Sequence, residues 1–323
     1  MEQDIKYVLE VYKHGSFSKA ADSLFITQPA LSIAIQKIEK NIGMPLFDRS
    51  KKPLKLTAAG DLYIKKFQQI QYMENELAQQ LNDLSELNTG SLRIGGSHYF
   101  NSYVLPEILT KYKKIHPGIQ LNLLEASSND LIEMLANHEL DITFNCMEKP
   151  KDSFYRIHGF IDTILIAVPK CLEINERIKK FSLSAADIVA KKHQEFATPS
   201  VPLEFFSDTP FILLTPGNNL YNRSTTFLAD AHIKPNVCLQ VSQLVTAYHL
   251  SRNGMGATFI SDLLVSEEHN SVLFYKIDSP LAIRVFDLVM SNDAYISNAM
   301  KEFINLFQEH YGLYLDKRKI HKK

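Results

Sequence analysis

Apolar residues recur at helical spacing over the first 57 residues, and turn signals separate the runs. Apolar side chains at positions 5, 8, 9 and 12 step by three or four residues until His14-Gly15 ends the first run. Two further apolar sets, within 17–24 and 31–38, predict two more short helices separated by about three residues. Two short helices joined by such a turn are typical of a helix-turn-helix.

Capping residues support these helix boundaries. Either Ser16 or Ser18 can begin the second helix, because a short hydroxyl side chain accepts a hydrogen bond from a free N–H in the first turn. Thr27 is a natural N-cap for the third helix. Pro29 then lies inside the first turn, where a missing N–H costs little.

Residues 45–57 place apolar side chains on both sides of a basic tip, which predicts a short two-stranded wing. The tip and its second strand hold Arg49, Lys51, Lys52 and Lys55. Over residues 1–57, nine basic side chains stand against six acidic ones, whereas the whole chain has a formal charge of -1. This local positive charge favours a negatively charged partner for the first segment.

Residues 58–88 predict one long polar helix with a narrow apolar seam, ended by Asn88-Thr89-Gly90. The seam positions step by three or four residues: Ile70, Met73, Leu77, Leu81, Leu84 and Leu87. Such a stripe is too narrow to cover a globular core, so it favours dimerisation between two copies of the helix. A helix that lies on its own domain is the alternative.

Residues 91–311 alternate short β-rich runs with amphipathic helices, which predicts mostly parallel sheets with helices on both faces. The expected strands are 92–95, 120–125, 141–144, 164–168, 211–214, 236–241, 257–260, 272–276 and 282–289. The expected helices are 101–116, 128–137, 222–231, 242–252 and one from about 297. Some 220 residues are many for one such unit, so two subdomains with a cleft between them are expected.

Composition narrows the class of protein. The 323 residues are 45% apolar and 22% charged, as expected for two or three folded units. Cys146, Cys171 and Cys238 stand far apart and the eleven histidines have no ligand spacing, so neither a disulfide framework nor a metal site is expected. With no signal-peptide pattern and no apolar run of ~18 residues, we expect a cytoplasmic protein without a membrane segment.

Motifs for catalysis are missing from the sequence. It contains no GxSxG, HExxH or P-loop pattern, and Gly254-Met255-Gly256 is too short for a dinucleotide fingerprint. We therefore expect neither an enzyme nor a protein with a resident cofactor.

Two stretches resemble a known family. The run GSFSKAADSLFITQPALSIAIQKIEKNIGMPLFDRS at 15–50, with KLTAAG at 55–60, resembles the helix-turn-helix and wing of the LysR-type transcriptional regulators almost position for position. More weakly, LRIG at 92–95 and GMGATFIS at 254–261 resemble the effector domain of that family. The sequence departs from the family pattern between Cys171 and Pro210, where a Lys- and Pro-containing insert lies at about 179–202.

The resemblance implies a domain order and an α/β fold class. A winged helix-turn-helix DNA-binding domain occupies 1–57 and a linker and dimerisation helix occupies 58–88. A periplasmic-binding-protein-like effector domain of two α/β subdomains occupies 91–311. The basic tail at 312–323, which ends in DKRKIHKK, is expected to be solvated rather than bound to DNA.

A recognition helix presents its N-terminal residues to base edges in the major groove. The candidate DNA-binding residues are Ser16, Ser18, Thr27, Gln28, Pro29, Ser32, Gln36, Lys37, Arg49, Lys51 and Lys52. Gln28 can pair bidentately with adenine, whereas the wing residues meet phosphates or the minor groove and fix register. Ile33 replaces an Arg that many family members carry, so it either forgoes a guanine contact or reads a thymine methyl. A winged helix used for protein contacts is the alternative.

Ligands of such sheets lie beyond the carboxyl ends of strands, against helix N-termini. The candidate effector residues are Ser97, His98, Phe100, Asn101, Ser128, Asn145, Met147 and Arg223. The resemblance itself implies Ser97, His98, Ser128 and Arg223. Hydroxyls, helix N-termini and an Arg suit a small anion or carboxylate.

The expected function is ligand-responsive regulation of transcription. The partners are double-stranded promoter DNA at inverted repeats, a small-molecule effector and a second copy of the chain, and RNA polymerase is a further candidate. The family pattern implies a tetramer of two dimers. A solute-binding protein that uses only the later domain is the alternative, and it would show no salt-dependent DNA binding.

Overall fold

The computed structural model describes residues 2–51, 54–84, 89–146 and 153–311. Lys52, Met147, the last seam position Leu87 and the basic tail lie outside the described residues. The chain divides into two compact units, residues 1–81 with 137–139, and residues 82–136 with 140–323. Among the described helices, none combines the length and the hydropathy that a membrane crossing requires.

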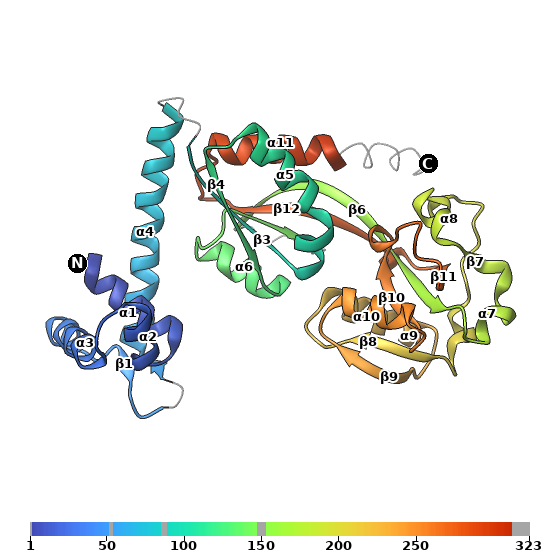
Figure 1. The fold of residues 1–323 in the computed structure, drawn as a ribbon, viewed down its shortest axis with the longest axis horizontal. Helices are drawn as coiled ribbons and strands as arrows, with labels where there is room; N and C mark the ends of the chain where they lie inside the picture. The colour runs from blue at the N-terminus through green and yellow to red at the C-terminus, as the bar shows by residue number, and fades with distance from the viewer. Residues whose placement is uncertain (1, 52–53, 85–88, 147–152, 312–323) are drawn as a thin grey trace. The chain divides into compact units, whose positions relative to one another are not determined.

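The first unit contains the predicted helix-turn-helix and wing (Figure 1). Its elements are α1 Glu2–His14, α2 Phe17–Ser23, α3 Gln28–Ile42, β1 Phe47–Asp48, β2 Lys55–Leu56 and α4 Ala58–Leu84. Of the two candidate caps of α2, Ser16 is the N-cap, and Thr27 caps α3 as predicted. Gly43 ends α3 with φ +78°, a backbone conformation that glycine adopts without strain.

The long linker helix is confirmed over 58–84. Its start is buried against the helix-turn-helix through Gly60 and Ile64. Its seam residues are exposed, from 40% for Ile70 to 82% for Leu84. Contact of such a long apolar stripe with water is unfavourable. The exposed stripe therefore agrees with the dimerisation surface that the sequence pattern predicts.

The second unit is built on an eight-stranded mixed sheet in the order β4-β3-β5-β12-β6-β11-β7, with β10 paired to β6. The strands are β3 Gly90–Gly96, β4 Ile119–Glu125, β5 Ile142–Asn145, β6 Phe154–Pro169, β7 Ser182–Leu183, β10 Thr258–Ser261, β11 Val272–Lys276 and β12 Ile283–Ser291. A separate parallel pair joins β8 Pro210–Leu214 to β9 Asn236–Val241. The main helices are α5 Pro106–Ile115, α6 Ser128–Ala136, α9 Asn219–Asp230, α10 Leu244–Arg252 and α11 Asn298–Tyr311.

The expectation of mostly parallel sheets is wrong for the centre of this unit. Only β3/β4, β3/β5 and β8/β9 are parallel among the described strand pairs of the unit, whereas β12 runs antiparallel to β5 and β6, and β10 and β11 run antiparallel to β6. Parallel neighbours need a crossover of a dozen or more residues, usually a helix. Among the described strands, β10, β11 and β12 do not pair with one another but each with β6, far earlier in the chain, so the lack of helices between the runs at 257–260, 272–276 and 282–289 gave no signal of this pairing.

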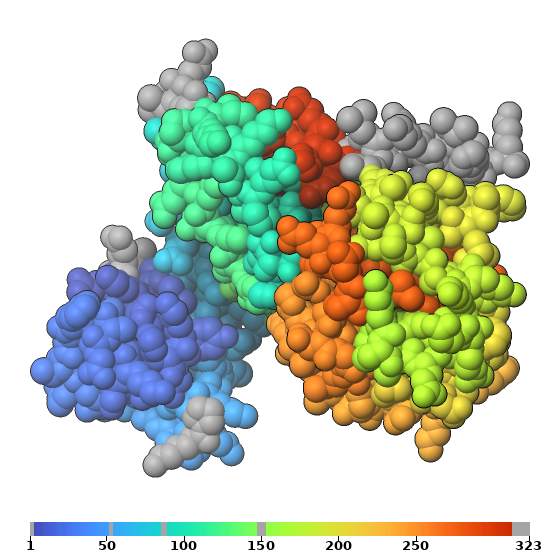
Figure 2. All heavy atoms as spheres, turned by 45° about the vertical axis from the view of Figure 1, so that its right-hand side comes forward, coloured from blue at the N-terminus to red at the C-terminus, as the bar shows by residue number. Residues whose placement is uncertain are grey.

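Two long strands divide the unit into two lobes. We define lobe I as residues 89–146, 153–161 and 285–311, and lobe II as residues 164–282. β6 and β12 pair from Phe154↔Ser291 to Thr163↔Ile283 and run from one lobe into the other (Figure 1). The two lobes confirm the expected subdomains, and they lie side by side in the space-filling view (Figure 2).

The insert at 179–202 belongs to lobe II. It forms the edge strand β7, which pairs with β11, and the short helix α8 Ala185–Val189. Ser184 and Asp187 make a capping box at the start of α8. The insert thus extends one edge of the sheet.

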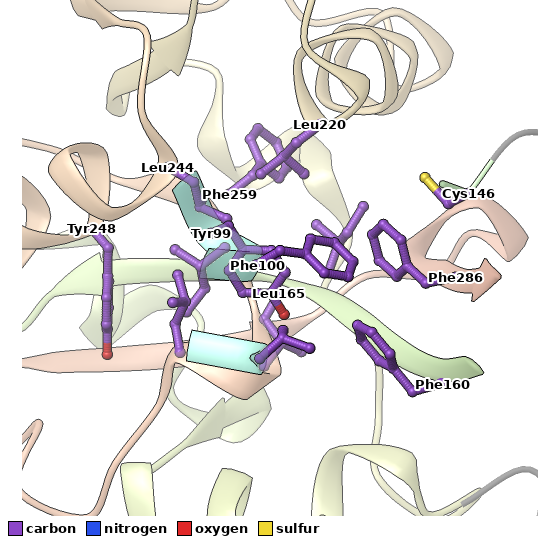
Figure 3. Close-up of a cluster of buried hydrophobic side chains, with 14 of the residues drawn as sticks. Tyr99, Phe100, Cys146, Phe160, Leu165, Leu220, Leu244, Tyr248, Phe259 and Phe286 are labelled. Atoms are coloured by element: carbon purple, nitrogen blue, oxygen red, sulfur yellow. The ribbon is translucent and has the colours of Figure 1, made fainter. Parts of the chain in front are cut away.

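The core of the second unit is aromatic where β6 and β12 leave lobe I (Figure 3). Phe100 packs 4.9 Å from the ring centroid of Phe286, and Phe160 stacks on Phe286 at 5.1 Å. Phe100 is 3% exposed and begins a π-helical turn, Phe100–Val104, ahead of α5. The single helix predicted over 101–116 is therefore two segments, and Pro106 begins the second one.

Candidate DNA-reading surface and effector cavity

The start of α3 presents a polar surface to solvent. Thr27, Gln28 and Pro29 are exposed, as are Gln36 and Lys37 further along the helix. Ser32 is half-buried, and Leu31, Ile35 and Ile38 cover the opposite face in the core. The predicted base-reading residues therefore share one exposed side of the recognition helix.

The remaining predicted DNA-binding residues flank α3 from α2 and the wing. Ser16 is half-buried, since its hydroxyl accepts a hydrogen bond from the N–H of Lys19. Ser18 lies exposed in the first turn of α2. Arg49 and Lys51 lie exposed in the wing.

Glu39, which is not among the residues predicted from the sequence, holds the wing against α3. Its Oε1 accepts hydrogen bonds from the N–H groups of Leu46 (2.8 Å) and Phe47 (3.3 Å). Its Oε2 lies 3.1 Å from Nη2 of Arg49, whose guanidinium also lies 4.9 Å from the centroid of the Phe17 ring. A single acid between Lys37 and Lys40 was the signal available in the sequence. Arg49 is thus a positioned cation rather than a freely moving one.

The wing is also fixed to the start of α4. The Thr57 hydroxyl donates to the carbonyl oxygen of Pro45 (2.6 Å) and accepts from the N–H of Gly60 (3.0 Å). A Cβ on Gly60 would stand 2.0 Å from the carbonyl oxygen of Leu46. Only glycine allows this approach of helix and wing. This close packing explains why the KLTAAG run at 55–60 ends in a glycine.

A cavity of about 490 Å³ lies between the two lobes of the second unit. Lobe I lines it with Ser97, His98, Glu125, Ala126, Ser127, Ser128, Asn129 and Asp130, and lobe II with Thr215, Pro216, Gly217, Asn218, Ser242 and Gln243. These residues follow the carboxyl ends of the parallel strands β3, β4, β8 and β9. This is the edge at which ligands of such sheets bind.

Three helix N-termini meet this cavity. Ser127 caps α6, because its Oγ accepts a hydrogen bond from the N–H of Asp130 (3.3 Å). Asn218 caps α9 by accepting the N–H of Leu220 (2.9 Å), and Gln243 begins α10 without a side-chain cap. Aligned peptide dipoles make such helix starts partly positive and favourable to anions.

Acidic groups balance these positive helix ends. Glu125 Oε2 lies 3.2 Å from Nδ1 of His98, and Asp130 accepts a hydrogen bond from the Ser127 hydroxyl (2.7 Å). None of the residues found to line the cavity in the described part of the chain is Lys or Arg. The hydroxyl of Ser128 has no hydrogen-bond partner among the residues that the structure describes.

Two family models match the chain. One, described as a bacterial regulatory helix-turn-helix protein of the lysR family, covers residues 3–61. The other, the LysR substrate binding domain, covers residues 85–179 and 181–312. The chain belongs to the LysR family. It is accordingly a transcriptional regulator with a DNA-binding helix-turn-helix and an effector-binding domain.

Relatives of similar length support this assignment. The HTH-type transcriptional regulator YcgK of Bacillus subtilis (strain 168) is 27% identical over 305 residues, which cover 94% of this chain and 93% of that protein. A probable RuBisCO transcriptional regulator of Emiliania huxleyi is 24% identical over 304 residues, which cover 93% and 91%.

Solved structures share the fold of this LysR-family chain. CbnR, a LysR family transcriptional regulator, matches with a TM-score of 0.64 at 15% identity over 95% of this chain and 98% of its own. CbnR complexed with its target DNA matches with a TM-score of 0.63 at 15% identity and the same coverage. The effector binding domain of QuiR in complex with shikimate matches with a TM-score of 0.55 at 16% identity over 70% and 99%.

The cavity of this LysR-family regulator brings together three of the residues predicted for the effector site. Ser97, His98 and Ser128 line it. Two of the others point elsewhere: Phe100 is in the aromatic core, and Asn145 is buried on β5 opposite Asp287.

Two further predicted residues support the structure around the cavity rather than line it. Asn101 donates through Nδ2 to the carbonyl oxygen of Leu124 (3.1 Å). Arg223 donates through Nη1 to the carbonyl oxygen of Leu281 (2.6 Å). Its burial in α9 follows from helical spacing, which places it on the same side as Leu220 and Phe227.

A buried polar network lies where β6 and β12 pass between the lobes. The guanidinium of Arg284 on β12 binds both carboxylate oxygens of Asp162 on β6, and the Ser261 hydroxyl donates to the same carboxylate (2.7 Å). The Tyr99 hydroxyl, from the loop after β3, lies 2.8 Å from the Ser261 hydroxyl. Burial raises the pKa of Tyr99 well above its usual value, so its hydroxyl keeps its proton.

Proposed function

We propose that this LysR-family regulator binds double-stranded promoter DNA at inverted repeats, and that a small anionic effector held between its lobes changes this binding. The observation that carries the proposal is the exposed start of α3 beside a wing whose Arg49 is held by Glu39. The N-terminal end of a recognition helix enters the major groove of DNA, and the fixed guanidinium of Arg49 next to it contacts the DNA backbone. The protein acts in the cytoplasm, with RNA polymerase as a further partner.

Dimerisation supplies the two-fold symmetry of the DNA site. The exposed seam of α4 is a surface that two copies of the helix can cover together. Two recognition helices related by such an axis reach successive major grooves, about 34–36 Å apart, which specifies an inverted repeat. Two dimers then form a tetramer across a longer promoter region.

The residues of the reading surface divide into two roles. Gln28, together with Ser32 and Gln36, reads base edges, and a Gln pairs bidentately with the N6 and N7 atoms of adenine. Arg49 and Lys51 neutralise phosphates, Ser16 and Ser18 donate hydrogen bonds to them, and these contacts fix the register.

The chemistry of the cavity supports a carboxylic acid that also carries a hydroxyl or an ammonium group. The starts of α6, α9 and α10 favour the carboxylate. The free Ser128 hydroxyl suits a hydrogen bond to it, whereas Glu125 and Asp130 suit a donor on the other end of the molecule. QuiR, which shares this fold, holds shikimate, a hydroxylated acid.

Effector binding acts by closing the lobes. A ligand that contacts Ser128 in lobe I and Asn218 in lobe II makes both contacts only when the lobes are close, so it binds the closed form better. A ligand shifts an equilibrium only through such a difference in affinity. The closed form then shifts the tetramer and changes the bend of the DNA.

The first experiment selects genomic DNA fragments bound by the purified protein and measures affinity for the best one across a salt series. We expect a two-fold symmetric motif and a steep loss of affinity with salt, because several phosphate contacts release counterions. A solute-binding protein would enrich no motif. Failure to enrich DNA at moderate salt would overturn the proposal.

Two variants test the division of roles on that DNA. Gln28→Ala should cost about 1–3 kcal/mol and relax one base position, whereas Arg49→Ala should weaken all sequences and reduce the salt slope by about 1. Lys170→Ala, an exposed lysine of lobe II, is the control and should leave the slope unchanged. Equal losses on all sequences for both variants would contradict the assignment.

Effector binding is tested by calorimetry with hydroxy acids, amino acids and unsubstituted carboxylates. We expect hydroxy or amino acids to bind, and the DNase footprint and bend to change at saturation. An unchanged footprint and bend with a bound acid would contradict the closure mechanism.

A further inference from the structure

Phe25 adopts a backbone conformation that side chains rarely take. It has φ +56°, in the left-handed region, immediately after α2. Its N–H donates to the carbonyl oxygen of Asp22 (3.2 Å), and the N–H of Ile26 donates to that of Ala21 (3.0 Å). This pair of bonds is the Schellman motif, whose left-handed position is usually glycine.

The fold gains nothing from an aromatic side chain at this position. Phe25 is 95% exposed, so it buries almost no apolar area in return for its strained backbone. Glycine would close the same two hydrogen bonds without a Cβ in the left-handed region. His232 takes the same left-handed position after α9 with φ +55°, so it is the exposed aromatic side chain of Phe25, rather than its backbone, that calls for an explanation.

Ile33 is a second exposed apolar residue on the same reading surface. It is 65% exposed, one helical turn after the exposed Pro29. Phe25 precedes Pro29 by four residues, and it lies two residues before the N-cap Thr27. Pro29 and Ile33, four residues apart, therefore lie on one side of α3 beside Gln28 and Ser32, whereas Phe25 lies in the turn that leads into this helix.

We propose that Phe25 and Ile33 form an apolar reading edge that contacts the C5 methyl groups of thymines in each half-site. These side chains would contact the major groove, because Ile33 lies on α3 next to the polar residues that enter it and Phe25 lies in the turn directly before this helix. In that groove only thymine presents a methyl group, and apolar side chains recognise it by contact. The half-site therefore carries thymines next to the adenine read by Gln28.

This inference rests on the DNA-binding function and adds a source of specificity to it. Ile33 cannot donate a hydrogen bond, so it does not read guanine as an Arg does. Selectivity at its position comes from burying a methyl group. Because no charge is involved, that selectivity is independent of salt.

The experiment replaces single thymines of the selected site by deoxyuridine, which removes only the methyl group. Affinities of the full-length protein are compared with those of Ile33→Ala, Phe25→Gly and Tyr12→Ala. Tyr12 is a half-exposed aromatic residue of α1, outside the reading edge, and its variant is the control. The thermal midpoint of each variant is measured without DNA.

For the wild type, we expect deoxyuridine to lower the affinity about fourfold per methyl group at one or two positions of each half-site. Ile33→Ala and Phe25→Gly should each abolish the effect at one position, and Tyr12→Ala should keep the whole profile. Phe25→Gly should also raise the thermal midpoint while it weakens DNA binding, which shows that the loss is not due to unfolding.

Three results would overturn the inference. Tight binding that is insensitive to deoxyuridine at every position leaves DNA binding intact and removes the apolar reading edge. A deoxyuridine profile that is unchanged in both variants shows that neither side chain contacts a thymine methyl group. Absence of any specific binding overturns the DNA-binding function and the inference together.

Discussion

Arg284 and Asp162 are register partners on β12 and β6, and they form an ion pair that is almost wholly buried between the lobes. Nε of Arg284 lies 2.8 Å from Oδ1 of Asp162. Tyr99 and Ser261 complete the hydrogen bonds of this carboxylate, so residues from both lobes share one polar centre.

Removing one partner of this pair should be far more costly than removing both. Asp162→Asn leaves a buried guanidinium without its counter-charge, and we expect about 3–5 kcal/mol loss of unfolding free energy. The double variant Asp162→Leu with Arg284→Met should recover most of it, because two apolar side chains need no counter-charge. Urea unfolding of the full chain measures both, and a cost below about 1 kcal/mol for Asp162→Asn would contradict the prediction.

Substitutions of the two adjacent serines at the start of α6 should have different effects, one on stability and the other on ligand binding. Ser127→Ala removes the helix cap and should cost about 1 kcal/mol of stability. Ser128→Ala should change stability by less than about 0.5 kcal/mol but lower effector affinity, because its hydroxyl lines the cavity. Urea unfolding and calorimetry with a bound acid give the two readouts. Unchanged affinity in Ser128→Ala would remove that residue from the site.

A charge in the seam of α4 should prevent dimerisation. Leu77→Asp places a carboxylate on the exposed apolar stripe, where a second helix would have to bury it. We expect a monomer by light scattering. Asn75→Asp adds the same charge to an exposed position off the seam and should keep the oligomeric state of the wild type. A dimeric Leu77→Asp variant would place the interface elsewhere.

Gly60→Ala should disturb the wing. The added Cβ would lie 2.0 Å from the carbonyl oxygen of Leu46, so helix and wing must separate. We expect a loss of about 1–3 kcal/mol, as for other overpacked positions. Ala58→Ser, at an exposed position in the same turn, is the control. Equal thermal midpoints for both variants would show that the wing can move without cost.

The capping box of the insert should respond to acid. Hydrogen bonds from Lys192 and Ser184 hold the pKa of Asp187 at about 2, below its usual 3.8. Because the folded value is the lower one, the stabilisation by the carboxylate is present above pH ~4 and is lost as the pH falls towards 2. The stability difference between wild type and Asp187→Asn should shrink over that range and stay constant above it. A constant difference down to pH 2 would contradict this.

Local sequence signals were sufficient to predict the helices of the first unit and several strands of the second. Thr27, Pro29 and Gly43 define α3 because caps and φ preferences act over a few residues. β11 occupies 272–276 as predicted, since a short run of β-rich residues between turns has few alternatives. Ser97, His98 and Ser128 could be placed beside the cavity because each lies shortly after the end of a strand and because the family resemblance implies them.

The sequence by itself determined the order of elements, the DNA-reading helix and the apolar seam, because each depends on residues close together along the chain. Only the tertiary structure decided which strands pair antiparallel, that Glu39 holds Arg49, and that Arg223 and Phe100 face away from the cavity. It also brought Asp162, 122 positions away in the chain, against Arg284. Such contacts depend on how distant elements pack, and residue type and spacing carry no information about that packing.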